Sequence, residues 1–491
     1  MSPRLEYRIY EIIPGLIIWI TIIGSFLLSI FAPLIAVILI IIFDVYWLLR
    51  VIYFCINLFV SWRHMKRVLR VDWISRMKTI EDWERRVHVV MLPTYKESKE
   101  VVFHTLNTLK NSSYPSQKLV VVLAGEEKDA ENFKRITEEA KHTFKNVFRE
   151  IIVTIHQFGI EGELPGKGSN LHHAGPVVKN WADSNGISYA DVIVSAFDVD
   201  TLPHQDYFSY LTYVYCTHPN PTRSSYQPIP LYFNNVWETR GIARVMSFGT
   251  TFWMMSEITR PFRLWTFSSH SMSLQALVDC GFWQNNLVSE DSRIFLQMFI
   301  RYDGNYEVTP LYLPVSMDTV EGASWWQSVK NVYVQQRRWA WGVENFPFMC
   351  WHFRRNPRIP FAKKRAMILR YAEGMYSWAV ASILILVLGR LPLYVAADSL
   401  QSNVLFQNTP FVLEQLMRYA MAGLFVSAGL SFTLLPQRPA HVSIATYFYL
   451  LLNWVLLPVT LLGLGSLPAI DSQTRLMLGS YLGFNVTPKK R

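Results

Sequence analysis

The sequence DVIVSAFDVD occupies residues 191–200, where a short apolar run ends in two aspartates that are separated by one residue. In an extended chain, alternate side chains share a face, so the carboxylates of Asp198 and Asp200 are expected to project together. Ligand sites of open α/β sheets lie beyond the carboxyl ends of the strands. Two hard oxygen ligands at such a place suit Mg²⁺ or Mn²⁺ bridging a diphosphate. The alternative for this short pattern is a solvated turn.

The chain around this run alternates between short apolar segments and polar segments with helical spacing. The runs VHVVML at 87–92 and KLVVVLAG at 118–125 are followed by turn residues, and residues 131–148 have helical spacing with mixed charges. Strands that alternate with helices predict a largely parallel sheet with helices on both faces. We therefore expect residues 82–350 to form one α/β domain.

Long uncharged segments lie outside this region. Residues 12–43 carry no charge, and as one helix they would rise about 48 Å, against a bilayer core of roughly 30 Å. Since Pro33 lies where a break is needed, we expect two crossings near 12–32 and 33–60. The whole chain is 51% hydrophobic and only 17% charged, whereas soluble domains carry about 25% charged residues. The composition therefore favours a membrane protein.

Three further spans are expected after the domain, which makes about five crossings. They lie near 371–396, 411–435 and 441–466. Lys and Arg crowd residues 63–86 and 354–370, and because cytoplasmic flanks are enriched in these residues, we expect the domain on the cytoplasmic side of the cell membrane. Three later spans would leave Lys489, Lys490 and Arg491 on the opposite side, against this rule. The alternative is that one C-terminal segment is re-entrant or interfacial.

These patterns divide the chain into four parts. We expect a transmembrane hairpin at 1–61, an interfacial amphipathic linker at 62–81, the cytoplasmic domain at 82–350, and an interfacial segment with transmembrane helices at 351–491. The net charge is +10, but no nucleic-acid recognition module accompanies it, so a nucleic-acid partner is not expected. The four cysteines show no CxxC spacing, which argues against a metal cluster or a disulfide framework.

Two polar motifs follow expected strands or precede expected helices. PTYKE at 93–97 follows the first strand and offers an aromatic ring for a base and donors for phosphate, with a plain strand-to-helix turn as the alternative. GKGSN at 166–170 supplies flexible backbone and Lys167 for a phosphate, although Walker spacing is missing. His172 and His173 are expected to be structural, because adjacent histidines do not easily share one metal.

Two more motifs lie later in the domain. In SEDSRIF, a carboxylate of Glu290 or Asp291 could act as general base for a hydroxyl nucleophile, and the alternative is a helix cap. In QQRRW at 335–339, Arg can neutralise a leaving diphosphate and Trp can stack on a sugar. The alternative here is a basic amphipathic helix that approaches the membrane.

The order PTYKE, GKGSN, DVD, SED and QQRRW, in one domain between membrane spans, resembles the family 2 processive glycosyltransferases, which include cellulose, chitin and hyaluronan synthases. The resemblance covers roughly 88–345. It implies a GT-A type nucleotide-sugar-binding α/β domain flanked by transmembrane α-helices. Where relatives usually have an aspartate at the end of the second strand, this chain reads LAGEEKD, so Glu126 or Glu127 would substitute.

The resemblance also implies roles for single residues. The implied nucleotide-sugar contacts are Thr94, Tyr95, Glu97, Lys167 and Asp198; the metal ligands are Asp198 and Asp200; the catalytic base is Asp291; and the diphosphate and acceptor contacts are Gln335, Arg338 and Trp339. The implied cofactor is Mg²⁺ or Mn²⁺.

The implied reaction is inverting, metal-dependent transfer of a sugar from a nucleotide-diphosphate donor to a growing polysaccharide at the cytoplasmic membrane face. Two alternatives stay open: a single addition to a lipid or polyprenyl-phosphate acceptor, and a transporter with a nucleotide-sensing domain. A ladder of products would indicate polysaccharide synthesis, and one labelled lipid would indicate a single addition. Donor binding without sugar transfer would indicate a transporter. The expected partners are the donor, the acceptor and membrane lipids.

Overall fold

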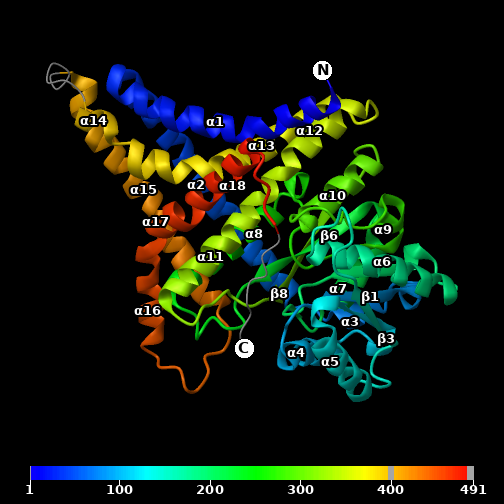
Figure 1. The fold of residues 1–491 in the computed structure, drawn as a ribbon. Coiled ribbons are helices and arrows are strands. Elements are labelled where there is room, and N and C mark those ends of the chain that lie inside the picture. The colour runs from blue at the N-terminus through cyan, green and yellow to red at the C-terminus, as the bar shows by residue number, and fades with distance from the viewer. Residues whose placement is uncertain (1, 396–402, 484–491) are drawn as a thin grey trace.

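The computed structural model describes residues 2–395 and 403–483. In Figure 1 the strands and shorter helices form one part of the molecule, and the long helices extend above and beside it. The expected orientation of Lys489, Lys490 and Arg491 falls outside the described residues.

A sheet of eight strands forms the centre of the first part, as far as the described residues show. The strands are β1 (Val87–Pro93), β2 (Leu119–Glu126), β3 (Glu150–His156), β4 (Val192–Ala196), β5 (Leu202–Pro203), β6 (Ser224–Leu231), β7 (His270–Ser273) and β8 (Glu307–Ser316). Their order is β3-β2-β1-β4-β7-β6-β8-β5. The first four strands pair in parallel, whereas β7 is antiparallel to both β4 and β6. The sheet is therefore mixed, with β7 and β5 running against the other six described strands, and it remains largely parallel as expected.

Helices cover both faces of this sheet. The helices of this part are α3 (Trp73–Met77), α4 (Lys99–Lys110), α5 (Ala130–Thr143), α6 (Lys167–Ser184), α7 (Tyr207–Thr217), α8 (Gly241–Ile258), α9 (Leu274–Cys280) and α10 (Glu290–Arg301). Val89 and Met91 of β1 pack in the core that includes α6, and Val90 and Leu92 pack in the core that includes α4 and α7. Alternate residues of a strand face opposite sides, so this pattern confirms the predicted α/β layering.

The second part consists of the remaining helices, several of which are long and apolar. They are α1 (Pro3–Phe31), α2 (Pro33–Val68), α11 (Trp325–Ala340), α12 (Asn345–Arg355), α13 (Phe361–Ile383), α14 (Leu391–Val395), α15 (Val404–Leu434), α16 (Thr446–Asn453), α17 (Leu457–Thr460) and α18 (Leu467–Leu478). Four helical stretches of the described chain are long and apolar enough to cross a membrane: Pro3–Phe31, Pro33–Val68, Phe361–Val395 and Thr446–Leu478. The first two meet at Ala32, where the break was expected from Pro33.

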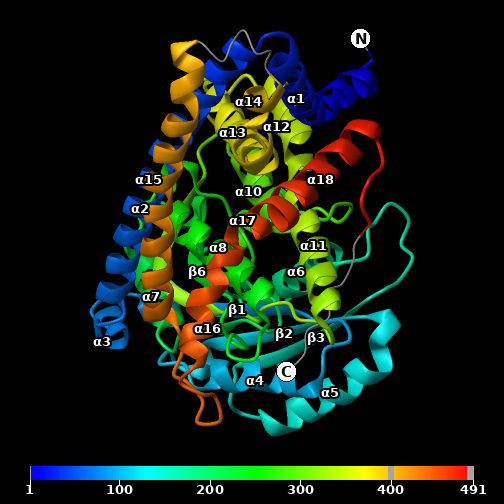
Figure 2. The same cartoon turned by 90° about the vertical axis from the view of Figure 1, so that its left-hand side faces the viewer.

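The fifth expected span, at 411–435, lies within α15 and is not one of these four stretches. Its first half carries Glu414 and Arg418, which pair with each other at 2.6 Å and reduce the mean hydropathy of the helix. In Figure 2, α15 runs alongside α2. The described residues therefore show four such stretches rather than the five expected.

Ion pairs tie helices of the second part together. Glu6 of α1 lies 3.1 Å from Arg354 and 2.7 Å from Arg355 at the end of α12. Arg50, a charge inside the second expected span, pairs with Glu373 of α13. This charge therefore faces a neighbouring helix, one of the two placements that its position in an apolar segment allows.

Candidate active site

One large cavity joins the sheet domain to the long helices. Its volume is about 1,700 Å³. The loops after β1, β2 and β4 line one end, α10 and α11 line the middle, and α2 and α13 line the other end. All ten residues to which the resemblance gives a role line this cavity: Thr94, Tyr95, Glu97, Lys167, Asp198, Asp200, Asp291, Gln335, Arg338 and Trp339. The sheet end lies beyond the carboxyl ends of parallel strands, the usual ligand position of such sheets.

A lysine between two aspartates lies at the centre of the site. Lys167 is the first residue of α6, and its Nζ lies 2.8 Å from Asp198 Oδ1 and 2.8 Å from Asp291 Oδ1. Burial by itself would lower the pKa of Lys167, but the two carboxylates outweigh it and raise the pKa above its ordinary value. The ammonium group therefore stays charged and holds together segments that lie far apart in the sequence.

The two aspartates of DVD lie in a turn rather than in an extended strand. β4 ends at Ala196, and the amide of Thr201 donates to the carbonyl of Asp198 at 2.8 Å. Asp198 Oδ2 accepts a hydrogen bond from Ser268 Oγ at 2.6 Å. Asp200 is only 1% exposed, and its Oδ2 accepts from the amide of Asp318 at 3.1 Å. Both still line the cavity, although the alternation expected of an extended chain does not place them there.

The donor atoms at this turn suit a divalent cation only with help from a substrate. No group of three or more His, Cys, Asp or Glu side chains is placed to hold a metal ion within the described part of the chain. Asp198 and Asp200 supply two hard carboxylates, and Mg²⁺ typically takes one or two protein carboxylates and completes its shell with phosphate and water. The residues therefore fit a cation that arrives with a diphosphate.

Glu290 and Asp291 begin α10 but have different surroundings. Glu290 is buried, and burial together with Asp291 raises its pKa, while Lys167 lowers it. Asp291 is partly exposed to the cavity, and its carbonyl accepts from Thr266 Oγ1. A Cβ added at Gly168 would lie 3.0 Å from the Cβ of Glu290, so the GKGSN segment packs directly on this carboxylate pair.

Two buried rings beside this centre were missed by the sequence reasoning. His270 begins β7, and its Nδ1 lies 2.7 Å from the carbonyl of Phe267 and 3.9 Å from Asp291 Oδ1. Burial lowers the pKa of His270, so the ring is neutral at physiological pH. Tyr232 lies just after β6. Burial raises its pKa, and the nearby charges of Asp198, Asp200 and Asp291 raise it further. No motif marks either residue, since only the sheet pairing brings β6 and β7 here.

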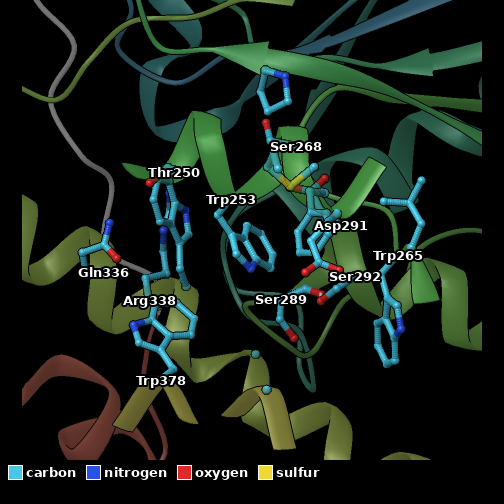
Figure 3. Close-up of a pocket in the computed structure, with 18 of the residues that line it drawn as sticks. Thr250, Trp253, Trp265, Ser268, Ser289, Asp291, Ser292, Gln336, Arg338 and Trp378 are labelled. Carbon is cyan, nitrogen blue, oxygen red and sulfur yellow. The ribbon is translucent and has the colours of Figure 1, made fainter. Parts of the chain in front are cut away.

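The QQRRW segment forms the last turns of α11. Gln335, Arg338 and Trp339 line the cavity, and the rings of Trp339 and Tyr232 have centroids 5.9 Å apart. Arg337 turns away, and its Nη1 lies 3.1 Å from Asp471 of α18. One face of α11 thus lines the cavity, and another face packs on α18. Figure 3 shows Arg338 on one side of the cavity and Asp291 on the other, with the ring of Trp253 between them in this view.

The PTYKE loop lies at the end of β1. Thr94 is buried, and its amide donates to the carbonyl of Ala124 on β2 at 2.8 Å. The amide of Tyr95 donates to the carboxylate of Glu97, which fixes the turn. Lys96 adopts a positive φ of 63°, and its amide donates to Asp129 Oδ2 at 2.9 Å.

The two glutamates at the end of β2, either of which could replace the usual aspartate, have different positions relative to the cavity. Glu126 lines the cavity, whereas Glu127 accepts a hydrogen bond from the amide of Phe158 at 2.8 Å. Glu126 Oε2 also lies 3.0 Å from Nδ1 of His156, whose Nε2 lies 2.8 Å from Glu163. Sequence spacing alone did not indicate this cluster. His172 has a structural contact as expected, with Nδ1 2.6 Å from the carbonyl of Trp283.

Comparison with known proteins finds only distant likenesses. No family model matches the chain, and no curated protein matches it. Among solved structures, the chain is similar to mannosyltransferase PcManGT from Pyrobaculum calidifontis in complex with GDP-Man and Mn²⁺, at 17% identity over 89% of this chain and 99% of that one, with a TM-score of 0.41. It is also similar to residues 1–349 of TarS from S. aureus in complex with UDP-GlcNAc, at 12% identity over 81% and 94%, with a TM-score of 0.35. Both TM-scores are below 0.5, so these similarities alone assign no function to this chain.

Proposed function

We propose that this protein is an inverting glycosyltransferase that moves a sugar from a nucleotide-diphosphate donor to the hydroxyl group of an acceptor at the membrane. The observation that carries the proposal is the Lys167 ammonium, which lies 2.8 Å from both Asp198 and Asp291 inside the cavity. A diphosphate that enters this space would compete with both carboxylates for the ammonium. Donor binding and the freeing of a base are then linked events.

The donor is proposed to lie at the sheet end of the cavity. Tyr95 supplies an aromatic face for the base, and Thr94 and Glu97 lie beside it in the same loop. Lys167 and Arg338 supply positive charge on either side for the diphosphate, and an arginine can bind phosphate oxygens in a bidentate manner. A divalent cation held by Asp198 and Asp200 would supply further charge neutralisation to the diphosphate when it is bound.

Asp291 is proposed as the general base. The acceptor oxygen attacks the anomeric carbon of the sugar and the bond from that carbon to the diphosphate oxygen breaks, so the configuration inverts. The hydroxyl proton passes to Asp291, and the nucleotide diphosphate leaves with the bonding electron pair, stabilised by Lys167 and Arg338. Burial and the charge of Asp291 raise the pKa of Glu290, which favours its protonated form, so Glu290 is not proposed as the base.

The acceptor class follows from the resemblance only in part. A growing polysaccharide is the acceptor in the processive family, and the aromatic side chains of Trp339 and Trp378 along the cavity suit sugar rings. A lipid acceptor remains the second candidate, because the far end of the cavity reaches the long apolar helices. The number of sugars added does not depend on the class of acceptor and is measured by the length of the product.

The test compares Asp291→Asn with Asp183→Asn, a control at an exposed carboxylate of α6 that is not part of the cavity. Purified protein in detergent is incubated with a panel of radiolabelled nucleotide sugars and Mn²⁺, and the products are sized. We expect Asp291→Asn to lower turnover roughly 10²- to 10⁴-fold, the usual contribution of a general base, with donor affinity retained. Near-normal turnover of Asp291→Asn would refute the base assignment. Donor binding by the unmodified protein with no sugar transfer would favour the transporter reading.

A further inference from the structure

The far end of the cavity carries an unusual concentration of positive charge. Five cationic side chains line it, from α2, from the turn after α8 and from α13: Arg50, Arg260, Arg263, Lys363 and Arg370. The neighbouring carboxylates are Glu257, Glu307 and Glu373, and one of them, Glu307, pairs with His218. Cations therefore outnumber carboxylates at this end.

The arginines nearest α8 share one carboxylate. Glu257 Oε2 lies 3.0 Å from Arg263 Nε, and the other oxygen pairs with Arg260. Arg260 is buried, and burial lowers its pKa, Glu257 raises it, and the nearby charges of Arg263 and Arg50 lower it further. Two guanidinium groups thus share the single carboxylate of Glu257, so this group of three side chains keeps a net positive charge that favours an additional anion.

Two further cations on α13 donate to backbone carbonyls, and the guanidinium of Arg370 also lies 4.8 Å from the centroid of the Phe262 ring. Arg370 Nη1 donates to the carbonyl of Phe262 at 2.9 Å, and Lys363 Nζ donates to the carbonyl of Gly304 at 3.0 Å. Within the described ranges, neither side chain has a carboxylate within 4.0 Å. A monoanionic or dianionic group placed here would gain charge-assisted hydrogen bonds that the protein itself does not provide.

Exposed aromatic rings surround this basic end. Phe262 is 64% exposed, Tyr53 is 48% exposed and Trp253 is 43% exposed. A rise of 1.5 Å per residue places Arg50 about 26 Å along α2 from Pro33, close to the roughly 30 Å of a bilayer core. Aromatic and basic side chains gather at that level of membrane proteins, beside the lipid headgroups. With one face of the bilayer core at Pro33, the basic end would lie near the other face, where lipid phosphates lie.

The basic end and the proposed catalytic centre belong to one continuous cavity. Trp253 also lines this cavity, and in Figure 3 its ring lies beside Asp291. The diphosphate of the donor already has Lys167 and Arg338 as cationic partners in the proposed function, so the cations near α13 are not needed for donor binding. A neutral glycan would not need them either, because sugars are recognised mainly by hydroxyl hydrogen bonds and ring stacking.

We propose that the acceptor is an anionic lipid, with its phosphate among Arg260, Arg263 and Arg370 and with a hydroxyl-bearing headgroup that reaches Asp291. This inference rests on the proposed function. The phosphate is the anchor rather than the nucleophile, because a phosphate oxygen needs no base and would be repelled by Asp291. The headgroup hydroxyl attacks the anomeric carbon, the bond to the diphosphate breaks, and the proton goes to Asp291. The product remains an anionic lipid with one more sugar.

The experiment uses the full-length protein in nanodiscs. Membrane lipids from the source cells are separated by anion exchange into neutral and anionic pools, and each pool is reconstituted with the protein and a radiolabelled nucleotide sugar. Phosphatidylcholine alone and the water-soluble headgroups released from the anionic pool serve as comparison acceptors. We expect transfer of label into organic-soluble lipid with the anionic pool, and little transfer with the other three.

The variants are Arg370→Gln with Lys363→Gln, and Arg365→Gln as a matched control on the same helix, where the exposed side chain does not line the cavity. We expect the first pair to raise the KM for the anionic pool about tenfold or more, with donor affinity unchanged, and Arg370→Lys to restore part of the loss. The control should behave like the unmodified protein.

Equal transfer with the neutral pool or with soluble headgroups, and equal KM values for the paired variant and the control, would overturn the anionic-lipid inference while leaving the transferase intact. Absence of both sugar transfer and slow donor hydrolysis under every condition would instead refute the proposed function. The experiment therefore distinguishes a wrong acceptor from a wrong enzymatic function.

Discussion

At the scale of single residues, Arg337 and Arg338 are neighbours on α11 and have different surroundings. Arg337 Nη1 lies 3.1 Å from Asp471 of α18, whereas Arg338 lines the cavity. Successive residues of a helix point about 100° apart, so the two guanidinium groups cannot both face the site. The sequence QQRRW does not by itself tell which arginine is structural, although the resemblance assigns the second to the diphosphate.

We expect Arg337→Gln to lower the free energy of unfolding by about 1–3 kcal/mol, because Asp471 loses a charged hydrogen-bond partner, with the donor KM unchanged. Arg338→Gln should instead raise the donor KM about tenfold or more and leave the free energy of unfolding nearly unchanged. Denaturation in detergent and steady-state kinetics measure the two quantities. If both variants weakened donor binding equally, the division of roles along α11 would be wrong.

At the scale of elements, a histidine ties the ends of β2 and β3 to the segment that leads into α6. His156, at the end of β3, lies within 3.0 Å of Glu126 and 2.8 Å of Glu163, and Asn285 donates to the other oxygen of Glu163 at 2.7 Å. The two glutamates raise the pKa of His156 above its ordinary value of 6.5, against burial, which lowers it. The intervening segment includes Gly166, which precedes Lys167 and lines the cavity.

We expect this tie to weaken as pH rises. A raised pKa in the folded protein means that the stabilisation is fully present below pH 6.5 and is lost as pH rises through the folded value. Neutral His156 can donate to only one glutamate, so the segment loosens and the donor KM should increase. His173 also faces the ring, and burial and the charge of His156 lower its pKa, so it stays neutral in this range.

The measurement is the donor KM as a function of pH, beginning below 6.5, for the unmodified protein and for His156→Gln. The amide side chain can make hydrogen bonds but does not titrate, so the variant should lack the rise. An identical pH profile in the two proteins would show that another group is responsible.

At the scale of the whole molecule, the cavity depends on the contact between the sheet domain and the long helices. The sheet domain supplies Lys167, Asp198 and Asp291, and the helices α2 and α13 close the other end. The ion pair of Glu6 with Arg355 joins residues that are 349 positions apart in the sequence, and the pair of Arg337 with Asp471 joins residues 134 positions apart. The proposed acceptor site exists only in this assembled form.

We expect the protein to be integral to the membrane, because four helical stretches carry long apolar surfaces, with exposed residues such as Ile20, Ile42 and Phe425 on the long helices. Membranes washed with high salt and then with alkaline carbonate should retain the protein, and detergent should release it. Release by carbonate would indicate that the helices pack only on the membrane surface or on one another.

Sequence patterns predicted the features that depend on neighbouring residues. The apolar run that ends at Phe197, the break at Pro33 and the α/β layering follow from local periodicity, apolar length and proline geometry. The prediction did not include the two strands that run against the other six, and one of the five expected spans is not among the four long apolar stretches of the described residues. Strand direction depends on the return path of a distant segment, β7, and the reduced hydropathy of α15 comes from the single pair Glu414 and Arg418.

The sequence by itself therefore determined the elements, their apolar faces and the residue types available for chemistry, since these are properties of the chain over a few turns of helix or a single strand. Only the tertiary structure decided that Lys167 lies between Asp198 and Asp291, that Tyr232 and His270 join them, and that distant cationic side chains line the same cavity. Such contacts arise when distant segments bury their apolar faces against each other, and residue spacing along the chain carries no record of the distances that packing creates.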